Sequence, residues 1–178
     1  MRHEIQLVGQ GGQGIRLAGA ILARAFGIYD KKNIVETHLY GAAARGGLSE
    51  SELVISDEEI YYVKVQNPDV LIVLSQRAYD DFSEPVKNSG VILADDFYVK
   101  NFKGDDKRLT LYPLTRIALD TTGSLIAVNV VSLGLISALY SVINVESMRK
   151  AIRDLIREKH LSKNLEAFEE GYKLGDNR

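Results

Sequence analysis

The sequence contains no cysteine among its 178 residues. Disulfides and thiol nucleophiles both require cysteine, and cysteine thiolates are the usual ligands of iron–sulfur clusters. The absence therefore excludes disulfide cross-links, thiol catalysis and any iron–sulfur cluster held by cysteines of this chain.

The sequence also lacks an excess of charge of either sign. Lysine and arginine number 22 against 24 acidic residues, which gives a net charge of −2. No basic cluster or aromatic–basic stripe suggests a nucleic-acid surface, so we expect no nucleic-acid partner. The start of the chain shows no signal-peptide pattern, and we therefore expect a cytoplasmic protein.

Charged residues are missing from one long stretch, residues 125–143. This run approaches the ~20 residues that cross a bilayer. It also contains Asn129, Tyr140 and several serines, and no second such run accompanies it. We interpret it as a helix buried in a core or an interface, and we predict that its apolar face contacts a neighbouring chain, with no membrane involved.

The apolar pattern alternates between strand and helix along the chain. The run Val70-Leu71-Ile72-Val73-Leu74 is typical of a strand covered on both faces. We expect a single three-layer α/β/α domain over residues 1–178, with a mostly parallel sheet and a helical C-terminal third. The expected strands are residues 4–8, 33–39, 49–55, 70–74, 91–94 and 109–112, and helices are expected at 15–26, 79–86, 145–159 and 164–174.

A glycine motif, Gly9-Gln10-Gly11-Gly12-Gln13-Gly14, lies between the first strand and the first helix. In this Rossmann-like context glycines let the backbone approach a phosphate, and the helix N-terminus offers free N–H groups. Dinucleotide sites also need an acidic residue about 20 positions later, and Glu36 lies at about that distance but inside the predicted second strand. Phosphate binding and a simple tight turn both remain open from these residues alone.

The glycine motif and several later blocks resemble the gamma subunit of 2-oxoacid:ferredoxin oxidoreductases. The resemblance covers about the first 135 residues. It departs from the family pattern at Ala42-Ala43-Ala44, where relatives often have an acidic residue. The blocks are residues 9–14 with Leu17-Ala18-Gly19 and Leu22-Ala23, Tyr40-Gly41 with Arg45-Gly46-Gly47, Ser56-Asp57, residues 67–72 with Ser75-Gln76, and residues 129–134.

The resemblance implies a non-catalytic subunit of a larger enzyme, with a lean toward the 2-oxoglutarate type. In such enzymes alpha and beta subunits hold thiamine diphosphate with Mg, and iron–sulfur clusters on partner chains, including a ferredoxin-like subunit, pass electrons to ferredoxin. Coenzyme A takes the acyl group. The gamma chain is expected to lie on the coenzyme A side, without a metal or a catalytic residue of its own.

Two segments supply the expected binding residues. Both should emerge at the carboxyl ends of neighbouring parallel strands and face one anionic cavity. Arg45 is the expected charged contact, with a salt bridge as its alternative, and Tyr40 could stack on an adenine or simply pack. The predicted residues are Gly9, Gly11, Gly12, Gln13 and Gly14 in the first segment, and Tyr40, Arg45, Gly46 and Gly47 in the second.

Other functions find less support in the sequence. His3, His38 and His160 lack metal-ligand spacing, and Asp95-Asp96 is more typical of solvated loop carboxylates than of a magnesium site. A nucleotide-dependent dehydrogenase or reductase, and a module that binds a nucleotide without chemistry, remain the alternatives.

Overall fold

The computed structural model describes residues 1–40 and 47–176 and shows one six-stranded sheet. The strands lie in the order β2-β3-β1-β4-β5-β6. The sheet is mostly parallel, as expected. Their bounds are β1 Arg2–Gln10, β2 Asn33–Tyr40, β3 Leu48–Ser56, β4 Val70–Val73, β5 Val91–Asp95 and β6 Leu109–Tyr112.

Strand β3 runs against the other strands. It pairs antiparallel with both β1 and β2, whereas β1, β4, β5 and β6 pair parallel to one another. The prediction that the first and second strands are neighbours is therefore wrong, because the β2–β3 hairpin folds back and inserts β3 between them. β1 and β2 still point the same way, so their carboxyl ends lie at one edge of the sheet.

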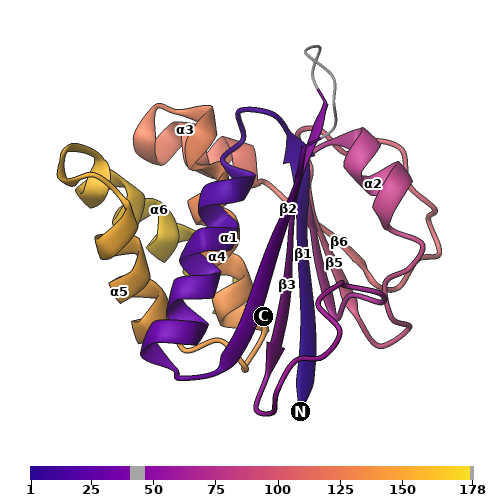
Figure 1. Ribbon diagram of the computed structural model, residues 1–178. Helices are drawn as coiled ribbons and strands as arrows, with labels where there is room; N and C mark the ends of the chain where they lie inside the picture. The colour runs from indigo at the N-terminus through magenta and orange to yellow at the C-terminus, as the bar shows by residue number, and fades with distance from the viewer. Residues whose placement is uncertain (41–46, 177–178) are drawn as a thin grey trace.

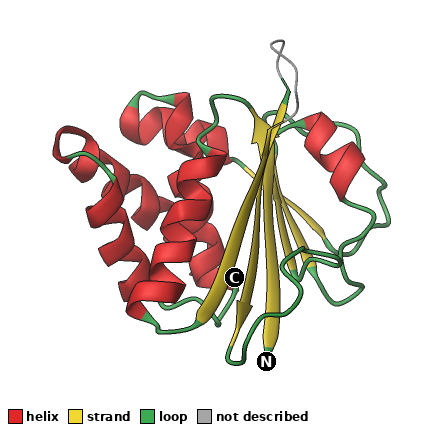
Figure 2. Ribbon diagram, viewed as in Figure 1, coloured by secondary structure: helices red, strands yellow, loops and turns green. Residues whose placement is uncertain are grey.

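The helices form two unequal layers around the sheet (Figures 1 and 2). Helix α2 lies on one face, and the other helices cover the opposite face, which confirms the predicted α/β architecture and its helical C-terminal part. The helices are α1 Ile15–Arg24, η1 Ala25–Tyr29, α2 Gln76–Phe82, α3 Leu114–Thr122, η2 Leu125–Ala127, α4 Val128–Leu139, α5 Val145–Leu155 and α6 Glu158–Asp176.

Each face of the sheet has its own hydrophobic core. The larger one joins α1, α3, α4, α5 and α6 to inward residues such as Ile5, Leu7 and Leu53. The smaller one packs Ala78 and Tyr79 of α2 against Val8 and neighbouring strands. The unbroken apolar strand β4 is buried along its whole length because it contributes to both cores.

Most of the long apolar stretch is buried within its own chain. It forms η2 and α4, and residues 128–137 are buried within this chain, chiefly against α6. The predicted contact helix is therefore a central core helix, and α3 before it was not predicted. Leu125 and Ile126 at its start are about half exposed, at 48% and 57%. Among the described residues, no helix is long and apolar enough to cross a membrane.

Candidate functional site

The glycine loop connects the end of β1 to the start of α1. Gly12 has φ 93° and Gly14 has φ 73°, backbone conformations that favour glycine over any residue with a side chain. Gly14 is the N-cap of α1, and no side chain caps this helix. The first N–H groups of α1 are therefore not satisfied by a capping side chain, and Gly11 and Gly12 are exposed beside them.

Gln13 braces this loop from inside. Its Oε1 accepts a hydrogen bond from the Gln10 N–H at 2.6 Å, and its Nε2 donates to the Leu74 carbonyl at 2.8 Å. A Cβ on Gly9 would lie 2.5 Å from the same Oε1, so glycine at that position makes room for the amide. Gln13 therefore fixes the loop onto the end of β4, and its side chain is occupied by the protein.

Asn129 of α4 holds the other end of the loop. Its Nδ2 donates to the Gly14 carbonyl at 3.0 Å, and its Oδ1 accepts from the Val130 N–H at 2.8 Å. A Cβ on Gly14 would lie 2.4 Å from this Nδ2. Asn129 is buried, and its side-chain amide is hydrogen-bonded inside the chain, where it ties α4 to the glycine loop.

The second predicted segment meets the loop at Gly47. The Gly11 N–H donates to the Gly47 carbonyl at 3.3 Å. The backbone of Tyr40 ends β2 and pairs with Ser49. The Tyr40 side chain, Arg45 and Gly46 lie outside the described part of the structure, so their predicted contacts stay predictions.

A cavity of about 270 Å³ opens beside the glycine loop. No charged side chain is among its described lining residues, so among these residues the positive potential comes from the N–H groups of the loop and the N-terminus of α1. It is lined by Gln10, Gly11, Gly12, Gln13, Tyr98, Thr115, Leu125 and Ile126.

Tyr98 and Thr115 were not predicted as site residues. They follow β5 and β6, whose carboxyl ends lie at the same sheet edge as that of β1. The rule that ligands of parallel sheets bind beyond the carboxyl ends of the strands is the signal that could have found them. Leu125 and Ile126 reach the cavity through the turn after α3, which the sequence pattern did not reveal.

Asp95 positions Thr115 and is not a solvated carboxylate. It is fully buried, accepts the Thr115 N–H at 3.2 Å and also accepts the Thr115 hydroxyl. Burial raises its pKa, although these hydrogen bonds oppose the rise. Asp95 thus anchors the start of α3 to the end of β5. Among the described residues no group of three or more His, Asp or Glu side chains could hold a metal ion.

Glu36 does not point to the glycine loop. Its carboxylate accepts a hydrogen bond from the Ser51 hydroxyl at 3.1 Å and lies 3.1 Å from His38 Nε2. A Cβ on Gly19 of α1 would lie 2.2 Å from Glu36 Oε1, so this carboxylate packs beneath the middle of α1. Burial raises its pKa. A dinucleotide site with Glu36 on the ribose is not supported.

The sequence matches the pyruvate ferredoxin/flavodoxin oxidoreductase family over residues 4–174. The chain belongs to this family. The 2-oxoglutarate synthase subunit KorC of Methanocaldococcus jannaschii is 47% identical over 176 residues and is covered to 94% by a match that spans 98% of this chain. The family suggested by the sequence motifs is therefore confirmed.

Two solved structures of similar fold come from related oxidoreductases. The gamma subunit of a keto/oxoacid ferredoxin oxidoreductase from Geobacter sulfurreducens has a TM-score of 0.88 and 35% identity, with 98% of this chain and 97% of that chain covered. The 2-oxoglutarate:ferredoxin oxidoreductase of Magnetococcus marinus, solved with 2-oxoglutarate, coenzyme A and succinyl-CoA bound, shares the fold at a TM-score of 0.80 and 24% identity. There the match covers 99% of this chain but 31% of the longer chain.

Proposed function

We propose that this chain is the gamma subunit of a 2-oxoacid:ferredoxin oxidoreductase of the 2-oxoglutarate type. In the assembled enzyme the 2-oxoacid loses carbon dioxide, coenzyme A takes the acyl group, and ferredoxin accepts the electrons. The full-length relative named as a 2-oxoglutarate synthase subunit supports the substrate type, and the family membership supports the reaction class.

The partner chains supply the redox chemistry in this proposal. Thiamine diphosphate with Mg and the iron–sulfur clusters lie on alpha, beta and ferredoxin-like subunits, and the complex works in the cytoplasm. The chain has no cysteine with which to bind a cluster. Residues 1–178 then act as one structural domain on the coenzyme A side of the complex.

The glycine-loop cavity is the observation that carries the coenzyme A assignment. An exposed loop of glycines, an uncapped helix N-terminus and a cavity at the carboxyl edge of the sheet together suit a phosphate-bearing ligand. Arg45 is the proposed cation of the same site. A dehydrogenase is less well supported, because Glu36 packs under α1, away from the loop.

Gly11→Ala tests this assignment in the assembled enzyme. Among the described residues, the nearest atom to a Cβ on Gly11 is the Gly47 carbonyl oxygen at 3.8 Å, an ordinary contact, so the fold should tolerate the methyl group. The methyl would stand between the ligand and the loop backbone. We expect the KM for coenzyme A to rise about tenfold, because the variant should lose roughly one charge-assisted hydrogen bond to the ligand. The KM for the 2-oxoacid should stay unchanged.

Gly104→Ala is the matched control. A Cβ there meets nothing within 4 Å, and Gly104 does not line the cavity. Steady-state kinetics with coenzyme A varied at saturating 2-oxoacid would compare the two variants with the parent enzyme. An unchanged KM for coenzyme A in an assembled Gly11→Ala enzyme would count against the glycine-loop site.

A further inference from the structure

Strand β2 forms a long open edge of the sheet. The sheet order places β2 at one end and β6 at the other, so each has one side that pairs with no strand in the described part of the chain. Strand β6 has only the four residues Leu109–Tyr112, and a short edge exposes few backbone groups. Strand β2 pairs with β3 along all eight residues Asn33–Tyr40. Its outer side therefore carries a long row of backbone N–H and C=O groups with no strand beside it.

The β2 edge lacks the usual protection against pairing with another chain. Proteins commonly protect an edge strand with lysine, proline or a bulge, or cover it with a helix or loop. Strand β2 contains neither lysine nor proline, and its register with β3 is continuous, without a bulge. Among the described elements it contacts mainly β3, α1 and η1, and its Leu39 side chain is 48% exposed. The edge is therefore open to a strand from another chain.

The sequence of β2 is complementary to itself when two copies pair antiparallel. If Thr37 of one copy lies opposite Thr37 of the other, Glu36 lies opposite the second copy's His38, and Val35 lies opposite its Leu39. Directly opposite residues of an antiparallel pair point to the same face, with Cβ atoms about 4.5–5.5 Å apart. This register therefore joins an acid to a histidine on one face of the sheet and two apolar side chains on the other.

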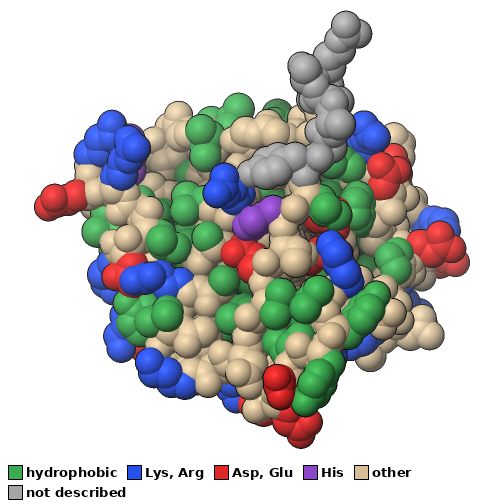
Figure 3. All heavy atoms as spheres, in the orientation of Figure 1, with side chains coloured by type: hydrophobic (Ala, Val, Ile, Leu, Met, Phe, Trp, Pro, Cys, Tyr) green, Lys and Arg blue, Asp and Glu red, His purple; other side chains and the backbone are tan. Residues whose placement is uncertain are grey.

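Glu36 and His38 are placed to make such contacts. Within the chain, Glu36 Oε1 lies 3.1 Å from His38 Nε2 and accepts a hydrogen bond from the Ser51 hydroxyl. Both side chains stay partly exposed, at 16% and 25%. A carboxylate has about four acceptor positions on its two oxygens, so Glu36 can accept a further imidazole N–H. Figure 3, in the orientation of Figure 1, shows histidine, acidic and hydrophobic side chains together on the face of the molecule over β2.

We propose that β2 pairs antiparallel with β2 of a second copy of this chain, with Thr37 at the two-fold axis. The two sheets then form one continuous sheet, with α1 of both copies on the same face. A two-fold axis presents the same surface from both copies, so the Glu36–His38 and Val35–Leu39 pairs each occur twice. The match of β2 with itself favours a second copy over an unrelated strand. This inference goes beyond the proposed function and does not rest on it.

Thr37→Cys tests the register directly, because the chain has no cysteine of its own. The two introduced thiols would lie opposite each other, so a short bismaleimide should convert most of the purified full-length chain into a covalent dimer. Asn33→Cys on the same strand is the matched control, because its two thiols would lie roughly 27 Å apart, beyond the reach of the reagent. No dimer with Thr37→Cys, or as much dimer with Asn33→Cys, would overturn the proposal.

A mixture of two further variants covers the case in which Thr37→Cys does not fold, since the Thr37 hydroxyl donates to Glu52. Val35→Cys and Leu39→Cys chains should cross-link to each other, and neither should cross-link with itself, because identical positions would be roughly 14 Å apart. Self-cross-linking of either variant at the level of the mixture would show a different arrangement and overturn the register.

Light scattering on the full 178-residue chain measures the pairing without a reagent. The parent chain should have the mass of two chains, and Leu39→Lys the mass of one, because the lysine would place a charge opposite the apolar Val35. Leu119→Lys is the control, because Leu119 is an exposed leucine of α3, at 39%, far from β2 in the sheet order. A parent chain with the mass of one, or the same mass for both variants, would overturn the proposal.

The assembled enzyme separates this proposal from the proposed function. There Thr37→Cys should cross-link this chain to a second copy of itself. Cross-linking to a different subunit would show that the β2 edge binds a strand of another protein, and the proposal would fall. The coenzyme A kinetics of Gly11→Ala are independent of this result, so either proposal can fail while the other stands.

Discussion

Gln13 shows how a residue in a ligand-binding motif can serve the loop itself. It lies where a ligand contact was predicted, yet its amide is bonded to Gln10 and to Leu74. Leu74 is 61 residues away in the sequence, so no local pattern reveals this role. The exposed backbone of Gly11 and Gly12 is what remains available to a ligand.

Glu50 of β3 is a buried carboxylate on the face of the sheet that carries α2. It accepts a hydrogen bond from Gln6 Nε2 at 2.6 Å and is 7% exposed. Burial raises its pKa, the Gln6 hydrogen bond opposes the rise, and the nearby Glu52 carboxylate adds to it. The charged form is therefore disfavoured in the folded protein relative to the unfolded chain.

Replacing Glu50 by glutamine should stabilise the protein at neutral pH. A group whose folded pKa is raised contributes stability that is present below its ordinary value of 4.5 and is lost as the pH rises through the folded pKa. Glutamine keeps an acceptor for Gln6 and has no charge to bury. We expect Glu50→Gln to raise the Tm at pH 7 and to have little effect below pH 4.5.

Thermal unfolding followed by circular dichroism across this pH range would measure the effect, with the exposed Glu58→Gln as control. A Tm increase that is the same at every pH would show that the gain has a cause other than charge burial. A lower Tm at neutral pH would show that the Glu50 carboxylate makes favourable interactions that an amide cannot replace.

At the scale of elements, α4 and α6 pack with their backbones in close approach. A Cβ on Gly134 would lie 2.0 Å from the Phe168 carbonyl oxygen, and one on Gly171 would lie 2.0 Å from the Val131 carbonyl oxygen. Both obstacles are backbone atoms, which cannot rotate away. This contact is what buries α4 inside the chain and explains why the predicted contact with another chain was wrong.

Gly134→Ala should destabilise the protein although alanine is the better helix former. The propensity gain is about 0.5–1 kcal/mol. Overpacking in a core typically costs about 1–3 kcal/mol, and here the clash is with backbone, so the cost should prevail. Denaturant unfolding should give a lower free energy of unfolding than for the parent chain.

Gly104→Ala again serves as the control, since a Cβ there meets no atom within 4 Å. It should leave the free energy of unfolding within about 0.5 kcal/mol of the parent value, as surface substitutions do. A Gly134→Ala protein as stable as its parent would mean that α6 can shift away from α4 at little cost.

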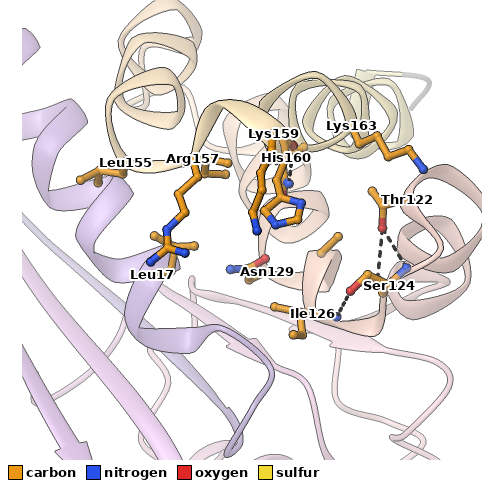
Figure 4. Close-up of a pocket in the computed structure, with 13 residues that line it drawn as sticks. Leu17, Thr122, Ser124, Ile126, Asn129, Leu155, Arg157, Lys159, His160 and Lys163 are labelled. Atoms are coloured by element: carbon orange, nitrogen blue, oxygen red, sulfur yellow. Dashed lines mark hydrogen bonds between the residues drawn. The ribbon is translucent and has the colours of Figure 1, made fainter.

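For the whole molecule, sequence periodicity predicted the structural features that depend on residues close together in the sequence. The alternation of apolar strands and helices gave the α/β class, and the glycine spacing placed a loop between β1 and α1. The insertion of β3 between β1 and β2 depends on pairing between distant segments, and so does the covering of α4 by α6. The cavity between α1 and the turn from α5 into α6 was missed for the same reason, because Leu17 and Arg157 line it together only in the folded chain (Figure 4).

The chain as a whole should be inactive without its partners. It has no cysteine for a cluster, and its described residues contain no group of three or more His, Asp or Glu side chains that could hold a metal ion. We expect the purified chain to contain no iron and to show no turnover with 2-oxoglutarate, coenzyme A and ferredoxin. Adding the partner subunits should restore acyl-coenzyme A formation, because in the proposed function they supply the thiamine diphosphate and the electron path. Metal analysis and a turnover assay before and after this addition would check both expectations. Turnover by the lone chain would refute the subunit assignment and favour a free-standing enzyme.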